Sequence, residues 1–172
     1  MKYFSGFSLH NEEDLFEEYI SNTKTTVVGF SYGAQKAFDY VYETKNRVDR
    51  LILLSPAFFQ TEKKSFIRTQ LRYYDTNQTN YIKQFSLNTT YPSQIDISKY
   101  LAAGNNKELE SLLAYQWDQD KIQELLDRNI TIEVFLGMQD KIIDADEADD
   151  FFSKNTRTYI IKSVGHLLKA EI

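Results

Sequence analysis

The stretch TTVVGFSYGAQKAFDYVYE, from Thr25 to Glu43, decides the fold of this 172-residue chain. Gly29 and Gly33 flank Ser31, although the chain contains only six glycines. The β-branched residues before Gly29 predict a strand. The apolar residues after Gly33 recur at helical spacing and predict an amphipathic helix over 34–42. Ser31 is therefore expected at a sharp turn from a strand into a helix.

This arrangement matches the Gly-x-Ser-x-Gly nucleophile elbow. An abrupt strand-to-helix turn strains the residue at its tip. The turn fits only if the residues two positions before and two positions after the tip lack side chains. The Ser31 hydroxyl then projects above the sheet beside the helix N-terminus. A structural turn without chemistry is the alternative. The strand before the motif and the helix after it favour the elbow, so we predict that Ser31 is a nucleophile.

Strands and helices alternate along the rest of the chain. Strands are predicted at residues 2–5, 25–30, 50–56, 130–137 and 157–162. Further helices are predicted at 12–21, capped by Asn11, and from Asp146 onward. The order predicts an α/β fold in which helices flank a mostly parallel sheet.

Residues 57–129 interrupt this alternation after the third strand. The segment has no pattern of a buried strand. Helical patterns cover 62–75, 79–87, 94–103 and 106–127. We expect a helical cap over the strand ends, within a single domain that covers residues 1–172.

A serine hydroxyl needs a base to become a good nucleophile, and the chain offers only His10 and His166. In α/β folds with this elbow the order along the chain is serine, acid, histidine. That order selects His166, which follows the last predicted strand, over an ordinary core or surface histidine. We interpret His10, in the first loop, as incidental to the chemistry, and a place in the lining of the site is the alternative.

The acid should follow the strand at 130–137, where Asp140 and Asp144 are the candidates. Asp140 lies in the turn directly after the strand and is predicted to orient His166. Asp144 is better placed to cap the next helix, where acidic residues suit the positive end of the dipole. The acidic run lacks the glycine and terminal glutamate of a calcium loop, so no metal or other cofactor is expected.

Two backbone N–H groups are needed to bind the oxyanion of the reaction. One belongs to Tyr32, directly after the nucleophile, and the other is expected from the loop after the first strand. There Gly6 lets the backbone turn closely, so the N–H of Phe7 is the predicted second donor. The Phe7 side chain is expected in the core, over the acyl group of a substrate, or in both roles at once.

Composition excludes several other classes of protein. The net charge of −5 argues against a nucleic-acid-binding protein, and the absence of cysteine excludes disulfides and thiolate metal sites. No apolar run is long enough for a membrane span, and the first residues do not read as a signal peptide. The expectation is a soluble cytoplasmic protein of unknown oligomeric state.

The chain resembles the α/β-hydrolase superfamily. More narrowly, it is similar to the short pimeloyl-acyl-carrier-protein methyl ester esterases of epsilonproteobacterial biotin synthesis. Ser5 departs from the superfamily, where many relatives have histidine before the oxyanion glycine. The likeness covers almost the whole chain and rests on the motifs FSGF, NE..LFEE, GFSYGAQKA..Y, LLSP, ELESLL.Y, IEVFLGMQDKI.D and the closing HLL.

The resemblance implies a serine esterase that releases methanol from methyl pimeloyl-acyl carrier protein, with that carrier protein as its partner. Two alternatives stay open: a broad-specificity carboxylesterase or thioesterase, and a non-catalytic hydrolase-like binding module. Residues 57–85 carry five basic and two acidic residues, a net charge of +3. Because acyl carrier proteins are acidic, Arg68 and Arg72, which share one helix face, are predicted to contact the carrier-linked substrate. A solvated basic helix face is the alternative.

Overall fold

The computed structural model describes residues 1–20 and 22–171. Five strands form one sheet in the order β1-β2-β3-β4-β5, and every neighbouring pair is parallel. The predicted parallel α/β sheet is therefore confirmed. The strands are β1 (Lys2–Phe4), β2 (Thr26–Phe30), β3 (Arg50–Leu54), β4 (Thr131–Gly137) and β5 (Arg157–Ile161).

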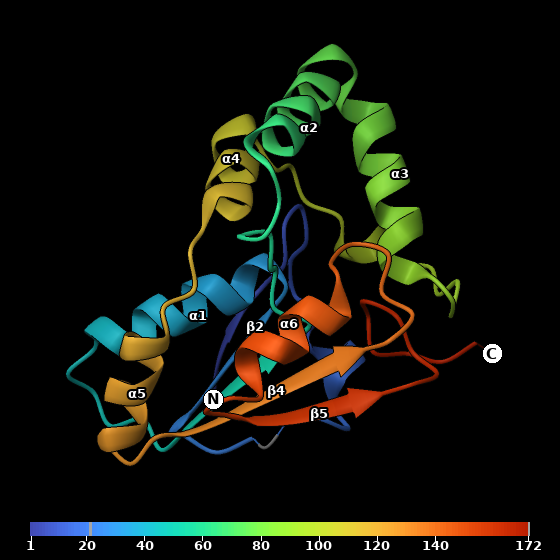
Figure 1. Cartoon of the computed structure of the whole chain (residues 1–172). Helices are drawn as coiled ribbons and strands as arrows, with labels where there is room; N and C mark the ends of the chain where they lie inside the picture. Colours follow the sequence, from blue (N-terminus) through green and yellow to red (C-terminus); the bar gives the residue numbers. More distant parts are fainter. Residues whose placement is uncertain (21, 172) are drawn as a thin grey trace.

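The helices form two groups (Figure 1). The first group, α1 (Tyr32–Glu43), α5 (Gln119–Asp127) and α6 (Ala145–Phe152), lies along the sheet. The second group, α2 (Lys64–Thr76), α3 (Gln78–Thr90) and α4 (Asn106–Ala114), stands above the start of α1. The predicted insertion at 57–129 thus contains α2 to α5. Only α2, α3 and α4 form the raised layer, because α5 packs beside α1.

Alternate residues of the strands divide the core into two layers. Val27, Leu51 and Leu53 face α1, α5 and α6. Phe30 and Ile52 face the opposite side, which is covered by the 3-10 helix η1 (Glu13–Phe16), by the 3-10 helix η2 (Ser98–Tyr100) and by residues 164–168. Burying side chains of this size contributes about 1.5–3 kcal/mol each. The second face therefore depends on irregular segments rather than on long helices.

The predicted helix at 12–21 is wrong. Residue 21 lies outside the described residues, and within 12–20 only η1 is helical; Asn11 has a φ of 53° instead of capping a helix. The reason is the side chain of Glu12, which points into the protein and is fully buried. Its carboxylate accepts hydrogen bonds from the Gly6 N–H and the Tyr3 hydroxyl, so the backbone wraps around it.

Two predicted helices of the insertion also differ from the structure. The pattern at 94–103 forms only η2, because this segment pairs with the loop after β1 at Leu9 and Leu101. The pattern at 106–127 is broken between α4 and α5. There the Trp117 indole donates to the Ala57 carbonyl, and Asp118 caps α5. Within the described residues, no helix has both the length and the apolar character of a bilayer span.

The two glycines of the elbow lie where no side chain fits. A Cβ at Gly33 would lie 2.0 Å from the carbonyl oxygen of Phe4 and 2.6 Å from that of Ser5. A Cβ at Gly29 would lie 2.2 Å from the carbonyl oxygen of Gly33. These contacts bring the end of β1, the end of β2 and the start of α1 together.

Gly33→Ala is expected to lower the free energy of unfolding by at least about 3 kcal/mol, because the new methyl group meets backbone atoms that cannot move aside. The midpoint of thermal unfolding should then fall by about 6–12 °C. Ser111→Ala, at an exposed position of α4, is the control and should leave the midpoint unchanged. Equal midpoints for the two variants would contradict the close approach of β1 to the elbow.

Candidate active site

The backbone at Ser31 has the strained geometry that the sequence predicts. Its φ is 54° and its ψ is −116°, a conformation that is uncommon for a residue with a side chain. The Ser31 N–H donates to the Leu54 carbonyl, and the Ser31 carbonyl accepts from the N–H groups of Ala34 and Ala57. Conformations of this kind cost about 1–3 kcal/mol and persist only where the surroundings fix them.

Ser31, His166 and Asp140 form one chain of hydrogen bonds. The distance from Ser31 Oγ to His166 Nε2 is 2.9 Å, and His166 Nδ1 lies 2.6 Å from Asp140 Oδ2. A carboxylate only accepts hydrogen bonds, so the ring carries its proton on Nδ1 and Nε2 accepts from the serine hydroxyl. His166 is fully buried, and the Asp140 side chain is 1% exposed.

The turn after β4 holds Asp140 in place. Its Oδ1 atom accepts from the N–H groups of Ile142 and Ile143, at 2.7 and 3.1 Å, which leaves Oδ2 for the imidazole. Asp144 instead caps α6 by accepting from the Glu147 N–H at 3.0 Å. Of the two candidate acids, the structure brings Asp140 and not Asp144 to His166.

Two close contacts restrain the imidazole of His166, one through the backbone of Gly165 and one through the ring of Phe30. A Cβ at Gly165 would lie 1.9 Å from the Tyr91 carbonyl oxygen. The ring of Phe30 packs on the imidazole of His166 with 5.1 Å between the ring centroids. The loop that carries His166 therefore has little room to shift.

Of the two predicted oxyanion donors, Phe7 lies in the loop after β1 and Tyr32 is the first residue of α1. Neither the Phe7 N–H nor the Tyr32 N–H donates to another group of the described chain. The Phe7 side chain is buried against Tyr74 and Phe85, with ring centroids 6.2 and 5.7 Å away. Phe7 is thus a core aromatic residue, and the part of its N–H in catalysis stays a prediction.

Other predicted residues lie apart from the triad. His10 is exposed, and its Nδ1 atom donates to the Tyr100 carbonyl at 2.8 Å. Arg68 and Arg72 lie on the exposed side of α2. Among the described residues, no group of three or more His, Cys, Asp or Glu side chains is arranged to hold a metal ion.

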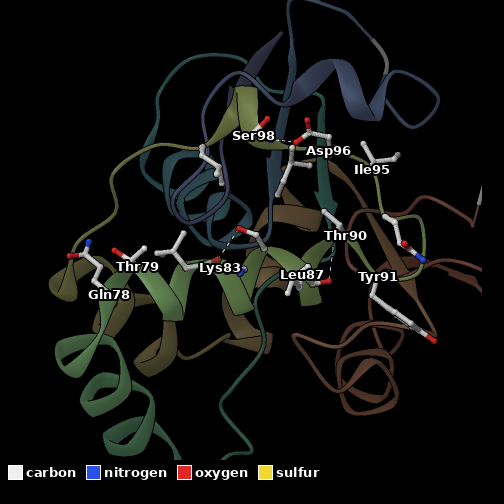
Figure 2. A pocket seen from close by; sticks show the side chains of 14 residues that line it. Gln78, Thr79, Lys83, Leu87, Thr90, Tyr91, Ile95, Asp96 and Ser98 are labelled. Carbon is white, nitrogen blue, oxygen red and sulfur yellow. Dashed lines mark hydrogen bonds between the residues drawn. The ribbon is translucent and has the colours of Figure 1, made fainter.

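A cavity of about 830 Å³ adjoins the triad beneath α2 and α3. Asp140 lines it, as does Phe85, which touches Phe7. Its apolar lining is Phe59, Phe66, Phe85, Leu109, Leu112, Leu113, Ile142 and Ile143. A second groove, of about 890 Å³, follows the opposite side of α3 past Lys83 and Leu87 and is lined by no triad residue (Figure 2).

Two buried polar side chains near the site escaped the sequence analysis. Gln35, on α1, donates from Nε2 to the carbonyls of Ala57 and Leu112, so it ties α1 to α4. A glutamine among the apolar residues of that helix was a usable signal. Glu12 gave none, because it lies in an acidic run that reads as a solvated helix start.

No protein-family model and no curated protein sequence matches the chain. Among solved structures, MenH from S. aureus superposes with a TM-score of 0.60 at 15% identity, over 95% of this chain and 85% of that one. BioG from Haemophilus influenzae gives a TM-score of 0.58 at 11% identity, over 96% and 87%. The chain has an α/β-hydrolase fold.

An esterase from Exiguobacterium antarcticum gives a TM-score of 0.56 at 15% identity and covers 90% of this chain. The chain spans only 63% of the length of that esterase. At these identities the likeness concerns the fold.

Asp140→Asn is expected to lower kcat about ten-thousand-fold. The Ile142 and Ile143 N–H groups would keep the carboxamide oxygen, so the NH₂ group would face His166 Nδ1 and impose the wrong tautomer. Asp144→Asn is the matched control and should retain kcat, because asparagine also caps helices well. The measurement is steady-state hydrolysis of a p-nitrophenyl ester. A larger loss in the Asp144 variant would show that the acid is misassigned.

Proposed function

We propose that the protein is a serine esterase, and the hydrogen-bonded chain of Ser31, His166 and Asp140 carries this proposal. Nucleophile, base and orienting acid each lie within hydrogen-bond reach of the next, which is the arrangement that activates a serine hydroxyl. The strained backbone of Ser31 between β2 and α1 supports the same function.

The reaction follows from these positions. His166 Nε2 takes the proton from Ser31 Oγ as that oxygen attacks the ester carbonyl, and Asp140 stabilises the imidazolium that forms. The oxyanion is held by the N–H groups of Phe7 and Tyr32. The imidazolium then gives its proton to the departing alcohol, and water hydrolyses the acyl-enzyme in the reverse sequence.

The proposed substrate is the methyl ester of pimeloyl-acyl carrier protein, which would yield methanol and pimeloyl-acyl carrier protein. The resemblance of the motifs to the carrier-protein methyl ester esterases supports this substrate. The apolar part of the cavity beside Asp140 suits an extended acyl chain. A broad-specificity carboxylesterase or thioesterase would use the same triad and would differ in its selection of the acyl group.

Purified protein is expected to remove one methyl group, a loss of 14 Da, from methyl pimeloyl-acyl carrier protein, as measured by mass spectrometry. It should turn over the free methyl ester of pimelate far more slowly. Ser31→Ala and His166→Ala should each lower kcat by about four to six orders of magnitude, because the two residues act as a unit.

The outcomes separate the candidate functions. Equal turnover of the free and the carrier-linked ester would favour the broad-specificity esterase. No turnover of any ester, together with no labelling by a fluorophosphonate probe, would leave a binding module as the better interpretation.

Electrostatic docking of the carrier protein on α2 is part of the proposal. Arg68 and Arg72 are exposed and one helical turn apart, and neither forms an ion pair within the described part of the chain. Neither arginine is among the residues that line the cavity beside Asp140. They are thus free to meet an acidic protein surface without contacting the acyl chain.

Reversing both arginines to glutamate is expected to lower kcat/KM about ten-fold or more on the carrier-linked ester, and added salt should reproduce part of the loss. Hydrolysis of a p-nitrophenyl ester should stay within two-fold of wild type. The control is Lys24→Glu combined with Lys45→Glu, which changes the net charge by the same amount. Both lysines are exposed; Lys24 lies just before β2 and Lys45 lies just after α1. An equal loss on both substrates would contradict docking on α2.

A further inference from the structure

Glu12 is a buried carboxylate without a cationic partner among the described residues. It is 0% exposed. Glu133, the other buried glutamate, pairs with Arg50. Glu12 meets only neutral donors: the Gly6 N–H at 2.7 Å and the Tyr3 hydroxyl at 3.2 Å, both on Oε1. Its Oε2 atom is buried and has no partner in the described chain.

Such burial is costly, because a carboxylate loses its hydration without the compensation of an ion pair. An apolar side chain would suit this fully buried position better. The features that only an acceptor side chain supplies here are the hydrogen bonds to Gly6 and Tyr3, and the bond to Gly6 is the shorter of the two. Burial and the neighbouring Glu12 carboxylate raise the pKa of the Tyr3 hydroxyl, so Tyr3 remains a protonated donor to the same oxygen.

Gly6 directly precedes Phe7, whose N–H is the second oxyanion donor of the proposed mechanism. The loop from Ser5 to Asn11 is held by three further backbone bonds. The Ala102 N–H donates to the Ser8 carbonyl and the His10 N–H donates to the Tyr100 carbonyl, both beyond Phe7 along the chain. Within the loop, the Leu9 N–H donates to the Gly6 carbonyl at 3.3 Å. The bond from the Gly6 N–H to Glu12, at 2.7 Å, is the side-chain contact that holds the loop on the β1 side of Phe7.

We propose that Glu12 is a positioning residue for the oxyanion hole. By accepting the Gly6 N–H, Glu12 fixes the backbone at Gly6 so that the Phe7 N–H is directed at the reacting carbonyl. The role rests on the proposed esterase function. Glycine has wide backbone freedom, so releasing its N–H would let the loop sample conformations in which the donor is misdirected. Losing one oxyanion donor lowers kcat by about 10²–10³-fold, and misdirecting it should cost part of that.

The test compares Glu12→Ala with Glu12→Gln. We expect Glu12→Ala to lower kcat on a p-nitrophenyl ester about 10–100-fold while KM changes less than about three-fold. Glu12→Gln should stay within about five-fold of wild-type kcat, because its carboxamide oxygen can accept the same bonds. In NMR hydrogen exchange, the Gly6 amide should exchange at least about ten-fold faster in Glu12→Ala than in wild type or Glu12→Gln.

Two controls separate positioning from loss of stability. Glu13→Ala removes the neighbouring carboxylate and should leave kcat and Gly6 exchange unchanged. Tyr3→Phe removes the other donor to Oε1, so it should lower the unfolding midpoint while kcat stays within about three-fold of wild type. If Glu12→Ala does not fold, Glu12→Asp, whose carboxylate is one methylene too short to reach Gly6, takes its place.

The outcomes distinguish this role from the proposed function. Unchanged kcat in the Glu12→Ala variant of an active enzyme would overturn the positioning role alone. So would a kcat loss in Tyr3→Phe as large as that in Glu12→Ala, or unchanged exchange of the Gly6 amide. An inactive wild-type protein would overturn the esterase function and, with it, this role.

Discussion

The close approach of backbone to backbone at the elbow is the constraint on which the site depends. The Gly33 Cα lies against the carbonyls of Phe4 and Ser5, and Gly29 lies against Gly33. With no side chain between them, the ends of β1 and β2 and the start of α1 share one small volume. As a result, the serine, the helix N-terminus and the loop after β1 lie next to one another.

The remaining parts of the site are fixed by contacts of the same tightness. Gly165 lies against the Tyr91 carbonyl, which brings the end of the α3 segment onto the histidine loop. Asp140 uses one oxygen for its own turn and the other for His166. Because each group is held by the backbone of a neighbouring element, the hydrogen-bond chain is organised before a substrate binds, which is the condition for effective electrostatic catalysis.

Irregular segments carry much of this organisation on the second face of the sheet. η1 and the residues around η2 occupy the place of longer helices, and they hold the loop after β1 from both sides. Glu12 belongs to one of these segments. Its hydrogen bond to Gly6 joins the packing of that face to the chemistry proposed at the carboxyl end of β1.

Much of the fold followed from local patterns. The five strands and α1 were predictable because β-branched runs and helical spacing act over a few residues. The insertion was predicted less well: the helices expected at 12–21 and 94–103 are wrong, and the pattern at 106–127 is broken at Trp117. In each case a side chain or backbone group bonds to a distant segment, and this contact overrides the local preference.

The sequence by itself determined the strained serine and the order of the triad residues, because the flanking glycines and the order of elements are properties of the linear chain. The sequence favoured Asp140 over Asp144 by its place directly after the strand, and the tertiary structure brings Asp140 to His166. Only the tertiary structure decided that Glu12 turns inward to hold Gly6. That orientation depends on burial against Gly6, six residues earlier in the chain, and a run of acidic residues carries no record of which side chain becomes buried.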